Sequence, residues 1–135
     1  MVATRSEISQ RHAQLHEGAA CLFRALDEHD GQTVTTAFRR FTDDLEAHLS
    51  IDLAVGYRLL LRHPSDSVRR IAERVIDEQE HFPQQFEVFS ARWRRADRHM
   101  FLTQAFRDEL ETLVSNLLKR IRIEERLLSA LSSVA

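Results

Sequence analysis

The chain has 135 residues, 43% of them hydrophobic and 30% charged, a composition that predicts one folded, soluble domain over residues 1–135 and excludes a disordered chain. The net charge of −2 gives no electrostatic reason to expect a nucleic acid or a membrane as partner, and 3 Gly with 2 Pro leave little material for an all-β fold. One cysteine and no long apolar stretch favour a cytoplasmic protein without disulfides, signal peptide or membrane span.

Helical periodicity runs through four segments of the chain, which are separated by breaking residues at 28–31, 63–66 and 92–100. No strand-like alternation competes with it. Short connections make neighbouring helices antiparallel, so we expect an all-α fold, an up-down-up-down antiparallel four-helix bundle. The apolar stripes contain, in chain order, Ile8, Leu15, Leu22 and Leu26; Val34, Phe38, Phe41, Leu45, Leu49 and Leu59; Val68, Ile71, Val75, Phe82, Phe86, Phe89 and Trp93; and Phe106, Leu110, Leu113, Leu117, Ile121, Leu128 and Leu131.

Pro83 falls inside the third of these segments. A proline there removes a backbone hydrogen bond and crowds the carbonyl of Gln79, so the segment either kinks or is two helices meeting at residues 81–83. A kink is favoured because Phe86, Phe89 and Trp93 continue the apolar stripe that begins before the proline.

Polar side chains interrupt the apolar stripes of the second and fourth segments. At about 100° per residue, His48 and Asp52 project on the apolar side of the second segment, and Arg120 and Glu124 occupy the equivalent positions in the fourth. Polar pairs that point into one bundle are costly unless they satisfy each other or share an ion. These residues are therefore the first candidates for a functional site.

The first and third segments add further candidate ligands. His12 and His16 are one turn apart near the buried side of the first segment, whereas His81 lies about 100° or more off the stripe of the third. Imidazoles and carboxylates at one-turn spacing on facing helices are how a bundle builds a non-haem iron site. Mixed nitrogen and oxygen ligands suit Fe, Mn or Zn rather than Ca.

The order of these residues resembles the hemerythrin-like, or HHE cation-binding, domain family. The resemblance is closest over residues 15–52, LHEGAACLFRALDEHDGQTVTTAFRRFTDDLEAHLSID, and extends through Glu80-His81 to the last helix. The family implies an antiparallel four-helix bundle with a non-haem di-iron centre, used for oxygen binding, for oxygen or nitric oxide sensing, or for iron handling. Residue by residue, it implies metal ligation by His16, His48, Asp52, His81 and Glu124.

Two positions depart from the family pattern. Asp52 stands where the family has Glu, and Arg120 stands where it has a ligand His. Arginine offers no lone pair to a metal, and its charge repels a second ion. We therefore expect an altered site: one metal on His16, His48 and His81 with a carboxylate, or no metal at all.

Three hypotheses about function follow. The first is a metal-binding domain, with iron as cofactor and a diatomic gas as ligand. The second is a metal-free regulatory or protein-interaction bundle in which Arg120 pairs with Asp52 and Glu124. A bundle enzyme is third, and the missing ligand at position 120 weighs against it. Within these hypotheses, His12 is the substitute if His16 faces away, and Arg120 with Glu124 could form a simple intrahelical pair at the bundle edge.

The arginine-rich run ARWRRADRH, residues 91–99, could suggest a nucleic-acid site. Trp93 lies on the apolar stripe, however, and cations at a helix C-terminus complement its dipole, so nucleic-acid binding is not expected. The sequence also has no Gly-rich phosphate loop, no Ser/His/Asp arrangement and no Cys/His zinc spacing, which argues against a hydrolase or a nucleotide enzyme.

Overall fold

The computed structural model describes residues 5–50, 61–79 and 81–132, and every regular element among them is a helix. The predicted all-α class is confirmed for this part of the chain. None of the described helices is both long and apolar enough to cross a membrane. The helices are α1 (Arg5–Asp27), α2 (Gly31–Ser50), α4 (Asp66–Gln79), α5 (His81–Trp93), α6 (Arg98–Phe101) and α7 (Gln104–Ser132).

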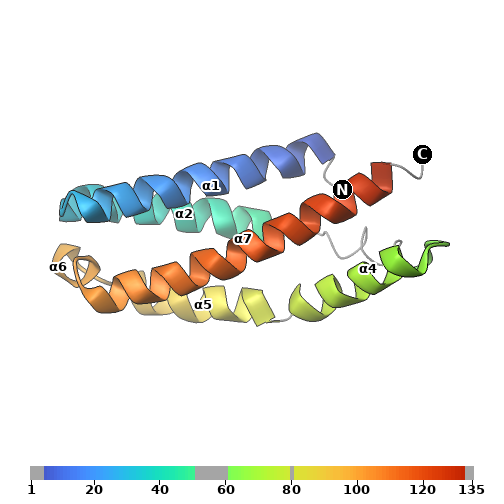
Figure 1. The fold of residues 1–135 in the computed structure, drawn as a ribbon. Coiled ribbons are helices and arrows are strands. Elements are labelled where there is room, and N and C mark those ends of the chain that lie inside the picture. The colour runs from blue at the N-terminus through green and yellow to red at the C-terminus, as the bar shows by residue number, and fades with distance from the viewer. Residues whose placement is uncertain (1–4, 51–60, 80, 133–135) are drawn as a thin grey trace.

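Helix α7 runs the length of the molecule and joins its two halves (Figure 1). It contacts α1 on one side and both α4 and α5 on the other, while α1 and α2 pack against each other as a hairpin. The beginning of α1 and the end of α7 lie at the same end of the molecule, so residues about 110 positions apart in sequence meet there (Figure 1).

Two apolar clusters make up the core. The larger one includes an aromatic group near α6, in which Phe106 lies 4.9 Å from Phe101 and 5.0 Å from Trp93 between ring centroids. The smaller one joins α1, α4 and α7 through residues such as Ile8 and Leu127. On α1, Ile8 belongs to the smaller cluster and Leu15 to the larger. A residue of α1 that is buried between Ile8 and Leu15 therefore lies where the two clusters meet.

The fold bears on three details of the sequence analysis. The break at residues 92–100 contains part of α6, which begins where the Asp97 side chain accepts hydrogen bonds from the backbone N–H groups of His99 and Met100. Pro83 lies in the first turn of α5, where its missing N–H costs no helix hydrogen bond. The predicted kink falls next to Glu80, which lies outside the described residues. Trp93 is buried and donates its indole N–H to Glu109, so its ring is not available for base stacking.

The turn between α1 and α2 is held by Asp30. His29 precedes it with φ of 55°, in the left-handed region, and reverses the chain direction. The Asp30 carboxylate accepts hydrogen bonds from the backbone N–H groups of Gln32 and Thr33 and from the Thr33 hydroxyl at 2.7 Å. These bonds lower the pKa of Asp30 and satisfy N–H groups that the first turn of α2 cannot pair internally.

Replacing Asp30 with alanine is expected to lower the free energy of unfolding by about 1 kcal/mol, because this N-cap is lost. Asp30→Asn keeps a side-chain oxygen that can accept the same bonds, and its cost should be a few tenths of a kcal/mol. Urea unfolding of the two variants checks this. Equal losses in both would show that the cap does not carry the effect.

Candidate metal centre

Three polar side chains from α1, α2 and α7 meet at a point from which water is excluded. Glu124 and His48 are 0% exposed, and His12 is 3% exposed. One carboxylate oxygen of Glu124, Oε2, lies 2.7 Å from Nε2 of His12 and 3.1 Å from Nε2 of His48. The two imidazole rings are 5.0 Å apart, edge to face. One donor atom from each residue lies within 4.8 Å of the others.

The helical repeat places each of the three on an apolar stripe. His12 follows Ile8 by one turn and precedes Leu15, while His48 follows Leu45 by three residues. Glu124 stands between Ile121 and Leu128 on α7. Each therefore lies at a position that the sequence pattern predicts to be buried. The packing of the three helices brings the three side chains together where the two apolar clusters meet.

A set of neighbouring groups fixes the orientation of these side chains. Nδ1 of His12 lies 2.6 Å from Glu125, and the Ser9 hydroxyl donates a hydrogen bond of 3.1 Å to the same Glu125 oxygen. Nε of Arg120 donates to Oε1 of Glu124 at 2.8 Å, and its guanidinium lies over the Phe82 ring. Both oxygens of Glu124 and both nitrogens of His12 therefore have polar partners.

The electrostatics of the cluster follow from these contacts. Burial disfavours a charged imidazole at His12, but hydrogen bonds and Coulombic attraction from Glu124 and Glu125 outweigh burial and raise its pKa above the ordinary 6.5. Burial would likewise raise the pKa of Glu124, but hydrogen bonds from His12 and His48 and the charges of His48 and Arg120 hold it far below its ordinary 4.5. Without a metal, the two carboxylates thus favour the protonated form of His12.

Two buried nitrogen atoms near the cluster lack hydrogen-bond partners among the described residues. These atoms are Nδ1 of His48 and Nη1 of Arg120. A buried donor without a partner costs free energy, so the polar network is not fully satisfied by the described side chains. These two nitrogen atoms are the points at which the described network has unused hydrogen-bonding capacity.

The metal-free protein should lose stability as pH rises above about 6.5. A group whose pKa is raised on folding contributes stability below its unfolded pKa, and this is lost as pH passes the folded value. His12 behaves in this way, with a slope of up to about 1.4 kcal/mol per pH unit, whereas Glu124, with its lowered pKa, loses its contribution only below pH 4.5. Stability is therefore expected to be greatest between these two limits.

Urea unfolding in EDTA at several pH values measures this dependence. His12→Gln should flatten the decline above pH 6.5, and His16→Gln, one turn away on the exposed side of α1, should leave it unchanged. A wild-type stability that does not change from pH 6.5 to about pH 9 would contradict the charge state assigned to His12.

The residues predicted from the sequence are placed as follows. His48 and Glu124 lie in the buried cluster. His16 is exposed on α1 and His81 is exposed on α5, and neither contributes to the cluster. Asp52 lies outside the described residues, so its predicted ligation and its predicted pairing with Arg120 stay predictions. Arg120 pairs with Glu124, as one of the alternatives expected.

His12 occupies the position on α1 for which His16 was the first candidate. Its signal in the sequence was its phase: it lies between Ile8 and Leu15 on the stripe, whereas His16 follows Leu15 by one residue, a rotation of about 100°. Glu125 and Ser9 were missed altogether. Glu125 is adjacent to Glu124 and faces α1, and helical phase alone does not single it out.

The donor set fits a first-row divalent metal ion. Two imidazole nitrogens and one carboxylate oxygen are the ligand types of mononuclear zinc and non-haem iron sites. Donors bound to one ion at about 2.1 Å lie roughly 3 Å apart. Two of the three donor pairs here lie 2.7 and 3.1 Å apart, and all three donor atoms lie within 4.8 Å of one another. Glu125 on the far nitrogen of His12 is the kind of partner that orients a ligating histidine.

The geometry and the donor atoms of the cluster support a metal site. The fold and the metal ligation that a resemblance to hemerythrin-like domains implies remain predictions about this chain. Comparison with known proteins adds nothing to them, because no family model, no curated protein and no solved structure matches the sequence significantly.

Proposed function

We propose that this chain is a hemerythrin-like four-helix bundle that holds one non-haem metal ion on His12, His48 and Glu124, with iron as the first candidate. The observation that carries the proposal is the convergence of three buried donor atoms from three helices within 4.8 Å. The fold part is supported by Figure 1, in which α1, α2, the pair α4 and α5, and α7 run in alternate directions.

A single ion is proposed because Arg120 forms a hydrogen bond with one of the two carboxylate oxygens of Glu124. Its Nε donates to Oε1 at 2.8 Å, which leaves Oε2 as the oxygen shared by the two histidines. A fixed guanidinium next to the site also repels a second cation. His16 and His81, both exposed, are not placed to supply a second ion with ligands.

The chain's own residues define what this centre can do. With Nδ1–H of His12 donating to Glu125, which Ser9 also contacts, Nε2 would be left free for the metal. The apolar clusters on either side exclude bulk water. His12, His48 and Glu124 would hold the ion through three ligands, and iron held in this way would supply the chemistry of binding a diatomic gas such as oxygen or nitric oxide. The proposed role is therefore gas sensing or iron handling.

The second candidate is a metal-free regulatory or interaction module. One observation favours it: the buried carboxylate of Glu124 already has a charge partner in Arg120 and a second in protonated His12. On this alternative the polar cluster acts only as a structural ion-pair network. It then specifies how α1, α2 and α7 pack, and function resides on the surface of the bundle.

Elemental analysis of protein produced with an iron supply separates the two candidates. The metal-centre proposal expects close to one metal ion per chain and an absorption spectrum without oxo-bridged di-iron bands. A stable, colourless and metal-free protein that also fails to take up added Fe(II) or Zn(II) would favour the interaction module. Two ions per chain would contradict the role assigned to Arg120.

A further inference from the structure

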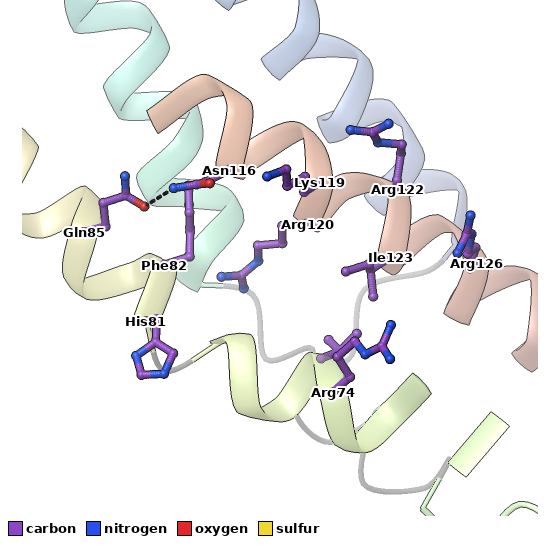
Figure 2. Close-up of a pocket in the computed structure, with 11 residues that line it drawn as sticks. Arg74, His81, Phe82, Gln85, Asn116, Lys119, Arg120, Arg122, Ile123 and Arg126 are labelled. Carbon is purple, nitrogen blue, oxygen red and sulfur yellow. Dashed lines mark hydrogen bonds between the residues drawn. The ribbon is translucent and has the colours of Figure 1, made fainter. Parts of the chain in front are cut away.

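A pocket of about 530 Å³ lies between α7 and the facing parts of α4 and α5. In Figure 2, Arg74 projects from α4 across the pocket from Ile123 on α7, and His81 and Phe82 come from the start of α5. This volume is within the range of pockets that bind small organic molecules. Among the residues that the structure describes, the pocket and the buried cluster share Arg120 alone.

The described lining of this pocket carries a concentration of positive charge and no carboxylate. The cationic side chains are Arg74, Lys119, Arg120, Arg122 and Arg126, in a protein whose net charge is −2. Like charges gathered around one hollow raise its potential and attract anions. The repulsion among them is a cost to the folded protein, and a bound anion would remove that cost.

These cations are not neutralised by described neighbours. Within the described part of the chain, no ion pair is formed by Arg74, Lys119, Arg122 or Arg126, and Nε of Arg122 donates to a backbone carbonyl of its own helix. Arg107, by comparison, pairs with Asp27 and with Glu111. Four of the five cations that line the pocket therefore have no counter-ion among the residues that the structure describes.

The inner wall combines a fixed cation with apolar and amide groups. The Arg120 guanidinium lies over the Phe82 ring, 5.4 Å from its centroid, and its Nη1 has no described hydrogen-bond partner. Ile123 adds aliphatic surface, and Asn116 donates to Gln85 at 3.0 Å, as the dashed line in Figure 2 shows. Such a wall suits a ligand with an apolar body as well as a charged group.

We propose that this pocket binds a small organic anion, one that carries a phosphate, carboxylate or sulfonate group on an apolar body. The anionic group would lie among Arg74, Lys119 and Arg126 at the rim, and the apolar body would lie against Phe82 and Ile123. The inference does not depend on a metal in the buried cluster, since the pocket and its charges are formed by the protein alone.

A matched pair of fluorescent probes tests the proposal. 8-Anilinonaphthalene-1-sulfonate carries an aromatic body and one negative charge, and N-phenyl-1-naphthylamine has the same body without the sulfonate. The full chain should bind the sulfonate at one site, at least about tenfold more tightly than the neutral probe, with an affinity that falls as salt is added.

Two double variants locate the binding site. The double variant Arg74→Gln with Arg126→Gln removes two charges from the rim and should weaken binding of the sulfonate probe about tenfold. The double variant Arg39→Gln with Arg40→Gln makes the same charge change on the exposed face of α2 and should change that binding less than twofold. Equal binding of the two probes, no binding of either, or equal effects of the two double variants would overturn the proposal. Parallel titrations in EDTA and in Zn(II) keep this result separate from the metal proposal.

Discussion

Replacing Glu124 with glutamine is expected to lower the free energy of unfolding of the metal-free protein by about 3–5 kcal/mol at pH 7. The carboxylate is fully buried and is the shared partner of His12, His48 and Arg120. Glutamine is nearly isosteric but uncharged, so Arg120, only 11% exposed, would stay in the interior without its counter-ion. Urea unfolding in EDTA measures the loss.

A matched change on the surface shows what an ordinary ion pair contributes. Glu111→Gln removes the same charge on the same helix, from a residue that lies 3.5 Å from Arg107 and is 56% exposed. Exposed pairs one turn apart contribute a few tenths of a kcal/mol, so this variant should differ little from wild type. A Glu124→Gln loss below about 1 kcal/mol would show that the buried network is not a major source of stability.

Saturating Zn(II) is expected to stabilise the protein by about 4 kcal/mol when free zinc is about 1,000 times the dissociation constant. The reason is mass action: the three donors converge only in the folded state, so the ion binds that state and not the unfolded chain. Binding also displaces the proton that His12 holds between two carboxylates, so the stabilisation should grow as pH rises from 6 to 8.

The dependence on single ligands identifies the site. His48→Ala should abolish the zinc effect, because it removes one of three donors from a buried position. His81→Ala should retain it, because His81 is exposed on α5 and contributes no donor. Equal stabilisation of wild type and His48→Ala would mean that zinc binds elsewhere on the chain.

Much of the arrangement could be predicted because apolar phase decides which helical positions are buried. Phe38, Leu45, Leu117 and Ile121 are buried as the periodicity expects, and so are the two polar residues His48 and Glu124 that interrupt their stripes. A polar group inside an apolar stripe must find a partner after burial, which is why these two pointed to a site. The all-α class followed from the same repeat.

What the sequence left open depended on contacts between helices. Helical phase favours His12 over His16 for burial, but only the packing of α1 against α7 shows that His12 faces Glu124. The contact of His12 with Glu125 has the same origin, since helical phase does not place two adjacent carboxylates on one face. The basic pocket is formed by α7 with α4 and α5, and no single segment reveals it.

A cobalt(II) titration of wild type, His12→Ala and His16→Ala tests whether His12 is the metal ligand on α1, because the two histidines lie one turn apart and only His12 is buried with Glu124. We expect one equivalent of cobalt with visible d–d bands in wild type and in His16→Ala, and an affinity at least about 100-fold weaker in His12→Ala. No bands in wild type, two equivalents per chain, or loss of binding in His16→Ala alone would contradict this expectation.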